Sequence, residues 1–319
     1  MTATAMRRVL VSAPYFQPVL DRFREVFAAA DIELVVPPVE ERLSEEELLE
    51  LVGDVDGAIC GDDQFTERVL RAAPRLKAIA KWGTGIDSID QQAATRLGIA
   101  VCNTPNAFTD PVADTVLGYI LCFARHILGV NHDMRRNVWV KRPLRSLREC
   151  TLGIIGLGNI GKAVAQRGAA FGMRLLGNDI LTISPEWLAQ AGVRGVGKEE
   201  LLRQADFVSL NCDLNATSFH LISGPELGLM KPTAYLINTA RGPIIDELAL
   251  MRALEQKQIA GAALDVFESE PLPADSLLRT MDNVLLAPHN ANSSPMAWEQ
   301  VHQNTVRQLL EHLSVPVSQ

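Results

Sequence analysis

Short apolar runs alternate with segments of helical periodicity along the first third of the chain. The runs predict strands at residues 9–12, 32–36, 58–60, 76–80 and 99–102. Nearly continuous apolar strands that alternate with helices are typical of a parallel sheet covered on both faces. The pattern therefore predicts an α/β domain.

Three helices between these strands carry local start or stop signals. Ser44 opens a capping box ahead of an apolar run. A second helix is expected to begin near Thr66 and to end before Pro74, and a third to cover residues 90–97 with Gly98 as its C-cap.

A longer apolar stretch follows. Asp110 and Pro111 are suited to the N-cap and the first position of a helix, and the pattern over residues 112–130 predicts one continuous helix. The stretch contains charged residues, which favours a buried or interface helix over a membrane span. Residues 131–149 are polar and basic, so we expect a crossover near a domain boundary.

A second α/β alternation fills the rest of the chain. Predicted strands lie at residues 152–155, 174–178, 207–211, 235–238, 262–266 and 284–287, with helices between them that include 246–258. Six strands with intervening helices match a doubly wound dinucleotide fold. An amphipathic helix is expected over residues 295–313, with Ser294 before Pro295 at its start.

Composition narrows the class of protein. The 319 residues carry 30 Lys and Arg against 38 Asp and Glu, a net charge of −8, which argues against a nucleic-acid partner. Five cysteines without a CxxC pair are typical of reduced thiols, so we expect a cytoplasmic protein with no metal site. The apolar runs are too short for a membrane span.

A G-x-G-x-x-G motif follows the strand predicted at residues 152–155. Its residues are Gly156, Gly158, Asn159, Ile160 and Gly161. Glycines allow a tight turn and close approach of the backbone to a pyrophosphate, and the helix N-terminus that follows favours the phosphate charge. Asp179, 18 residues after the third glycine, can accept hydrogen bonds from ribose hydroxyls and would repel a 2′-phosphate. The motif therefore predicts NAD rather than NADP.

Three further side chains follow predicted strands: Arg241, Glu270 and His289. Ligands bind beyond the carboxyl ends of the strands in open α/β sheets, so these groups can converge. A histidine can exchange a proton with an alcohol or ketone near neutral pH, a carboxylate can orient its ring, and an arginine can bind a substrate carboxylate with two hydrogen bonds. The set predicts hydride transfer on a 2-hydroxy or 2-oxo acid.

The chain resembles the D-isomer-specific 2-hydroxyacid dehydrogenases, and most of all their phosphoglycerate-dehydrogenase-like branch. The resemblance covers nearly the whole chain. It rests on residues 81–87 (KWGTGID), 103–106 (NTPN), the glycine motif, 238–242 (NTARG), 263–268 (ALDVFE) with Glu270-Pro271, and Pro288-His289. It implies two Rossmann-like or flavodoxin-like domains with doubly wound parallel sheets. An NAD domain (residues 105–289) would be inserted into a discontinuous substrate domain (1–104 and 290–319) that closes on the substrate.

The resemblance also assigns roles to residues. It implies a catalytic triad of Arg241, Glu270 and His289, and a contact between Asp265 and the nicotinamide carboxamide. Cys212, Thr239 and Ala240 complete the expected cofactor site. Backbone N–H groups of Thr84 and Gly85 would bind substrate, together with Lys81, which could meet a phosphate, a second carboxylate or only water. A homodimer built largely by residues 105–150 is implied as well.

Alternatives remain at this point. The substrate could be 3-phosphoglycerate, glycerate, glycolate or another short hydroxy acid, and the polar Asn290 and Asn292 could bind a substrate tail or only form a turn. Formate oxidation is disfavoured by Glu270, and phosphite oxidation by Thr84, because the resemblance implies other residues at these places in those enzymes. A binding protein that senses NAD(H) without turnover is the hypothesis from a different class.

Overall fold

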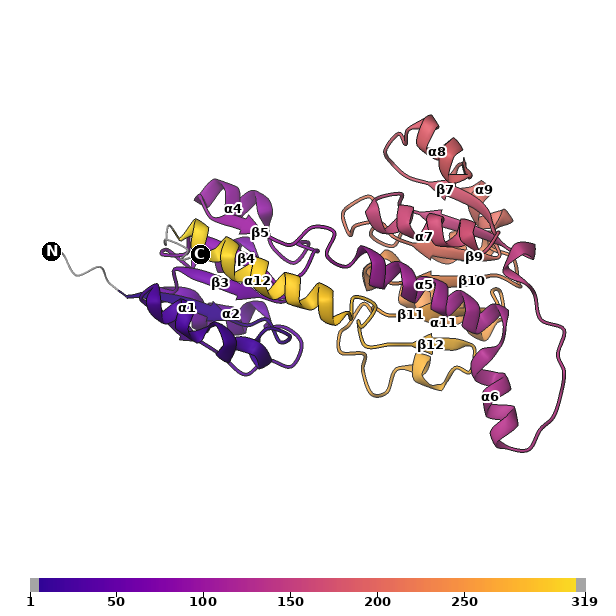
Figure 1. The fold of residues 1–319 in the computed structure, drawn as a ribbon, viewed down its shortest axis with the longest axis horizontal. Coiled ribbons are helices and arrows are strands. Elements are labelled where there is room, and N and C mark those ends of the chain that lie inside the picture. The colour runs from indigo at the N-terminus through magenta and orange to yellow at the C-terminus, as the bar shows by residue number, and fades with distance from the viewer. Residues whose placement is uncertain (1–5, 314–319) are drawn as a thin grey trace. The chain divides into compact units, whose positions relative to one another are not determined.

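The computed structural model describes residues 6–313 and divides the chain into two compact units (Figure 1). The first unit combines Met1–Ala107 with Ser294–Gln319, and the second is Phe108–Ser293. Each is built on a parallel sheet. The predicted fold class is therefore confirmed, with one α/β domain inserted into another.

The first unit has a five-stranded sheet in the order β2-β1-β3-β4-β5. All its neighbouring strands run parallel. The strands are β1 (Arg7–Val11), β2 (Ile32–Val35), β3 (Gly57–Cys60), β4 (Ala78–Lys81) and β5 (Ala100–Cys102). Every residue of β3 and β4 is buried, which is why these segments are apolar without alternation.

Helices cover both faces of this sheet: α1 (Arg24–Ala29), α2 (Glu45–Leu51), α3 (Glu67–Arg71), α4 (Gln91–Leu97) and α12 (Pro295–His312), with 3-10 turns at Gln17–Phe23 and Val52–Asp54. The predicted capping box at Ser44 is confirmed, and so is the left-handed C-cap at Gly98. Helix α12 packs on β3, β4 and β5, where His302 accepts a hydrogen bond from Trp82 at 2.9 Å. The carboxyl-terminal helix therefore completes the amino-terminal domain.

The second unit has a seven-stranded parallel sheet in the order β12-β11-β10-β9-β6-β7-β8. The strands are β6 (Thr151–Ile155), β7 (Arg174–Asn178), β8 (Val193–Gly195), β9 (Phe207–Leu210), β10 (Tyr235–Asn238), β11 (Gly261–Leu264) and β12 (Val284–Leu286). The sequence predicted six of them and missed β8. This edge strand has three residues, of which only Val193 is buried, so it leaves almost no periodic signal.

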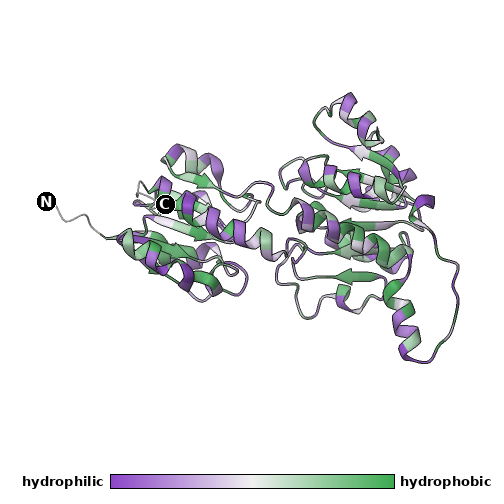
Figure 2. Cartoon of the chain, viewed as in Figure 1, coloured by the Kyte–Doolittle hydropathy of each residue, from purple (hydrophilic) through white to green (hydrophobic). Residues whose placement is uncertain are grey.

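The helices of the second unit contribute to two apolar cores. They are α5 (Thr109–Ala124), α6 (Ile127–Arg135), α7 (Asn159–Ala170), α8 (Pro185–Ala191), α9 (Lys198–Gln204), α10 (Gly224–Leu229) and α11 (Glu247–Glu255), with 3-10 turns at Leu147–Glu149, Gly242–Ile244 and Leu277–Thr280. One core contains residues of α5 and α7, and the other contains residues of α9, α10 and α11. Figure 2 shows apolar strands flanked by helices of mixed hydropathy.

The predicted helix over residues 112–130 is broken in the structure. Helix α5 ends at Ala124, and α6 begins at Ile127 after His126, whose φ is +47°. The Arg125 guanidinium donates hydrogen bonds to the carbonyls of Leu144 and Arg145. These distant partners hold the break. The sequence does not signal it, because the apolar pattern continues across residues 125 and 126 and neither of them is glycine or proline.

The predicted cap at Asp110 is also wrong. Helix α5 begins at Thr109, its N-cap position is Phe108, and no side chain caps it. Asp110 pairs instead with Arg167 of α7 at 2.9 Å, and Asp114 pairs with the same guanidinium at 2.6 Å. The carboxylate binds a partner from another helix rather than its own backbone.

Within residues 6–313, no individual helix has the length and hydropathy needed to cross a bilayer. Helices α5 and α6 pass that test only when they are taken together across a bend of 55°.

Candidate active site

The candidate catalytic residues follow three neighbouring strands of the larger sheet. Arg241 comes after β10, Glu270 after β11 and His289 after β12. The glycine motif follows β6. The next strand in the chain, β7, lies on one side of β6, and the later strand β9 lies on its other side. Such a reversal of strand order is where doubly wound sheets bind ligands. The topology thus brings the candidates to one edge of one sheet.

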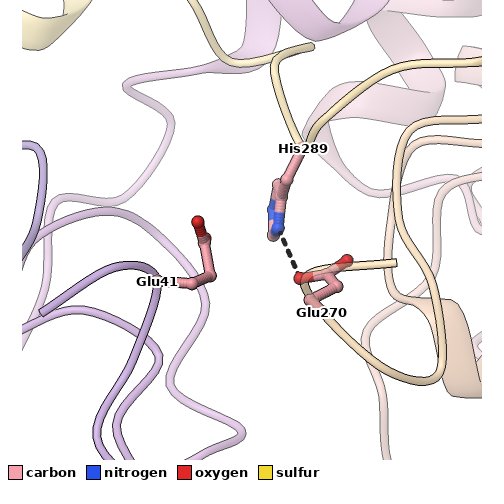
Figure 3. Close-up of side chains that lie close together, drawn as sticks. All are labelled: Glu41, Glu270 and His289. Carbon is pink, nitrogen blue, oxygen red and sulfur yellow. Dashed lines mark hydrogen bonds and ion pairs between the residues drawn. The ribbon is translucent and has the colours of Figure 1, made fainter. Parts of the chain in front are cut away.

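Glu270 and His289 form a hydrogen-bonded pair (Figure 3). The Nδ1 atom of His289 lies 3.0 Å from Oε2 of Glu270, and both side chains are largely buried. A carboxylate can only accept, so Nδ1 carries the hydrogen. The other carboxylate oxygen, Oε1, accepts the N–H of Phe267 at 2.9 Å. Glu270 is therefore anchored to its own turn and fixes the orientation of the imidazole.

Asp265 holds the loop that carries His289. Its carbonyl accepts the N–H of His289 at 2.7 Å, and its two carboxylate oxygens accept the N–H groups of Asn290 and Ala291 at 2.8 Å each. These three bonds stabilise His289 at a φ of +50°, a region that few residues other than glycine adopt. Asp265 is 1% exposed, and burial raises the pKa of its carboxyl group despite the donors.

The turn after β10 explains the NTARG motif. The buried Asn238 amide donates to the carbonyl of Arg241 at 2.8 Å, and its oxygen accepts the N–H of Ala240 at 3.1 Å. A Cβ at Gly242 would lie 1.9 Å from the backbone carbon of Phe267, so only glycine fits there. Arg241 is thus presented by a turn whose backbone touches the segment that leads to Glu270.

The residues around the glycine motif fit a bound dinucleotide. Gly156 has a φ of +88° and its Cβ would meet the backbone of Asn211 and Cys212, while a Cβ at Gly161 would lie 1.9 Å from the Gly156 carbonyl. A Cβ at Gly158 would meet nothing within 4 Å, so no protein contact requires glycine there. Close approach of a phosphate to the backbone does require it. Helix α7 begins directly after this glycine.

Three further predicted cofactor residues follow strands of the same sheet. Asp179 lies just after β7, where Oδ2 accepts the N–H of Leu157 at 2.6 Å and Oδ1 accepts that of Leu181 at 2.8 Å. The buried hydroxyl of Thr239 has no hydrogen-bond partner in the described part of the chain. Cys212, two residues after β9, is half-buried, and burial raises the pKa of its thiol to about 11, so it stays neutral.

The predicted substrate residues of the first unit follow β4. Lys81 is 4% exposed, and its Nζ atom lies 3.0 Å from Oδ1 of Asp62. Its ammonium also donates to the carbonyl of Trp82. Thr84 donates to the carbonyl of Thr104 at 3.2 Å, and Gly85 is the next residue of the same turn. Lys81 is therefore a buried, paired lysine rather than one that touches only water.

Sequence reasoning missed a second histidine–carboxylate pair. Nε2 of His220 lies 2.8 Å from Oε1 of Glu268, near the same edge of the sheet. No motif marks His220, and Glu268 entered the sequence analysis only as the last residue of the motif at 263–268. The contact of Asp265 with the His289 loop was also missed, because the partners are more than 20 residues apart and no local pattern links them.

The second unit of the chain matches a known protein family. Residues 117–291 match the family described as "D-isomer specific 2-hydroxyacid dehydrogenase, NAD binding domain". The chain belongs to the D-isomer-specific 2-hydroxyacid dehydrogenases. The predicted family, the NAD-dependent dehydrogenase class and the cofactor are thereby confirmed.

Individual members of this dehydrogenase family are similar over most of the chain. A glyoxylate reductase of Thermococcus onnurineus is 40% identical over 85% of this chain and 84% of its own length. A D-3-phosphoglycerate dehydrogenase of Synechocystis is 38% identical over 97% of this chain, but this covers only 54% of that protein. A D-lactate dehydrogenase of Aquifex aeolicus, complexed with NAD and lactic acid, superposes with a TM-score of 0.84 at 27% identity, covering 98% of this chain and all of that one.

Proposed function

We propose that this dehydrogenase interconverts a short, unphosphorylated 2-oxo acid of the glyoxylate type and its 2-hydroxy acid. The observation that carries the proposal is the His289–Glu270 pair at the carboxyl edge of the larger sheet. These two residues follow β12 and β11, and Arg241 follows the neighbouring strand β10. This is an acid/base group, its orienting carboxylate and a carboxylate-binding cation on adjacent elements.

The roles of the three residues follow from their chemistry. Nδ1 of His289 donates to Glu270, so Nε2 is the nitrogen that gives a proton to the carbonyl oxygen of the 2-oxo acid and takes it back in the oxidation. Glu270 stabilises the protonated ring through its opposite charge. The Arg241 guanidinium binds the substrate carboxylate with two parallel hydrogen bonds. When bound, NADH supplies the hydride.

The pairing of Lys81 favours an unphosphorylated substrate. Its ammonium is buried and its charge is balanced by Asp62 at 3.0 Å. A substrate phosphate would have to compete with this carboxylate for the ammonium. The name of the Thermococcus onnurineus relative, glyoxylate reductase, supports the same substrate class. Substrate contacts from Thr84 and Gly85 stay a prediction.

The direct test is NADH oxidation with a panel of 2-oxo acids. We expect turnover of glyoxylate and hydroxypyruvate, and a much lower kcat/KM for 3-phosphohydroxypyruvate. Preference for the phosphorylated acid would refute the substrate class and give Lys81 a phosphate contact. Binding of NADH with no turnover of any acid would refute the catalytic proposal and favour an NAD(H)-sensing protein.

Asp179 is expected to set the preference for NADH over NADPH. Replacing it with asparagine keeps an acceptor for a loop N–H but removes the charge that would repel a 2′-phosphate. Hydrogen bonds to charged groups contribute about 1.5–3 kcal/mol, so the ratio of kcat/KM values for NADH and NADPH should fall about 10-fold to 150-fold. Steady-state kinetics with both cofactors measures it.

Asp213 offers the matched control for this change. It is an exposed acid after β9, on the same edge of the same sheet. Asp213→Asn should leave the cofactor preference unaltered. If Asp179→Asn also leaves it unaltered, another group discriminates the ribose.

The expected homodimer is supported by an exposed apolar arm. We define this arm as α6 and the segment after it, residues 127–140. No residue of α6 is buried, and the arm exposes Ile127, Leu128, Met134, Val138, Trp139 and Val140. Trp139 is 79% exposed. Six exposed apolar side chains within 14 residues favour an interaction surface, and we propose that a second copy of the chain covers it. A cytoplasmic location remains an expectation.

We expect the wild-type chain to sediment as a dimer and Leu128→Glu to shift it toward the monomer. Leu128 is 54% exposed, so the charge costs little in the isolated chain but would be buried in the interface. Leu248→Glu on α11, where the leucine is 62% exposed, should leave the dimer intact. Sedimentation equilibrium checks all three proteins, and a monomeric wild-type chain would contradict the proposal.

A further inference from the structure

The pair formed by His220 and Glu268 connects the segments that carry Arg241 and Glu270. The ring Nε2 atom of His220 lies 2.8 Å from Oε1 of Glu268, two residues before Glu270. The backbone N–H of the same histidine donates to the carbonyl of Pro243 at 2.8 Å, two residues after Arg241. One residue therefore bonds to both turns.

Glu268 is also hydrogen-bonded to the first residue of α11. Its Oε1 atom accepts the N–H of Glu247 at 3.3 Å, and the Glu247 carboxylate accepts the N–H of Glu268 at 3.2 Å. Burial raises the pKa of Glu247, and the nearby carboxylates of Glu268 and Glu270 raise it further. His220 therefore donates a hydrogen bond to Glu268, a carboxylate that lies close to two other carboxylates, those of Glu247 and Glu270.

The backbone of His220 is in an uncommon conformation that its contacts maintain. Its φ is +49°, and its ring stacks on Phe219 with centroids 4.1 Å apart. Ile222 and Ile245 form a parallel bridge beside it, so the segment follows the Arg241 turn for several residues. A strained residue that is held by specific contacts is frequent where a protein fixes functional geometry.

We propose that His220 is a positioning residue for the dehydrogenase reaction, acting through Glu268 on the relative placement of Arg241 and Glu270. The inference rests on the proposed function, because it assumes that these two residues act on one substrate. The Gly242 backbone already lies against Phe267 and Glu268, so the two turns are in contact. The His220 ring adds a directional bond across that contact.

Side-chain variants separate the hydrogen bond from the ring. His220→Phe keeps a ring to stack on Phe219 but removes Nε2, and His220→Gln places an amide N–H near the same position without the ring. We expect kcat/KM for glyoxylate to fall about tenfold in the phenylalanine variant and to recover in the glutamine variant, since small misplacements of catalytic groups cost at least this much. Glu268→Gln keeps an acceptor and should retain activity.

The pair is tested by Glu268→Ala and by the double variant His220→Phe/Glu268→Ala. If the two side chains act only through each other, the double variant loses no more than either single one. The dissociation constant of NADH and the thermal midpoint should stay near the wild-type values in all variants, which a general loss of structure would not allow. His312→Phe, at the exposed end of α12, is the control.

Three results would overturn the proposal while the wild-type enzyme reduces glyoxylate. They are kcat and KM within twofold of wild type in His220→Phe, losses that multiply in the double variant, or a fall in NADH affinity equal to the fall in kcat/KM. Absence of wild-type turnover with every 2-oxo acid is a separate outcome, and it refutes the proposed function itself.

Discussion

His289→Asn should lower kcat for glyoxylate reduction by about 10²–10⁴-fold, which is the usual contribution of a general acid or base. Asparagine tolerates the left-handed backbone that His289 adopts, and its amide can still donate to Glu270. The variant therefore keeps the loop and the contact with Glu270 but has no nitrogen that titrates. NADH affinity should be nearly unchanged.

Steady-state kinetics, NADH fluorescence titration and thermal unfolding check this result together. His126→Asn is the matched control, because His126 also has a left-handed φ, +47°, but lies at the break between α5 and α6. The control should retain wild-type turnover. A His289→Asn enzyme with more than a tenth of wild-type kcat would remove His289 from proton transfer.

Arg241→Ala should lower kcat/KM for 2-oxo acids by about 10-fold to 150-fold, because a hydrogen bond to a charged group is worth about 1.5–3 kcal/mol. Much of the loss should be in KM, since the guanidinium holds a carboxylate that is present in the substrate as well as in the transition state. Arg241→Lys should recover only part of the activity, because an ammonium lacks the planar fork.

Guanidinium added to the Arg241→Ala enzyme should restore some activity, which would tie the defect to the missing group. Arg252→Ala on α11 removes an exposed arginine and should have no effect. Near-normal kcat/KM in Arg241→Ala would exclude Arg241 from substrate binding.

Signals confined to a few neighbouring residues were interpreted correctly from the sequence. The Ser44 capping box and the Gly98 C-cap depend on residues within one turn, so the sequence contains all the partners. The strand and the helix on either side of the glycine motif were predicted for the same reason, because they are consecutive in the chain. The strand of three residues at β8 was missed because it is too short to produce a pattern.

Errors arose where a distant side chain competes with a local preference. Asp110 has the right type and place for an N-cap, yet its carboxylate pairs with Arg167, 57 residues later. The break after Ala124 is held by contacts of Arg125 with residues 144 and 145. An N-cap bond and an exposed ion pair are each worth roughly 1 kcal/mol, so the local preference of Asp110 does not by itself decide its partner.

The sequence by itself determined the fold class, the family and the strand–turn–helix order around the glycine motif, because alternating apolar runs and consecutive motifs are encoded locally. Tertiary structure alone decided which oxygen of Glu270 binds His289, that Asp265 supports the His289 loop, and that Lys81 is already paired with Asp62. These facts depend on side chains from strands that are adjacent in the sheet but distant in the chain, and no spacing along the sequence specifies their geometry.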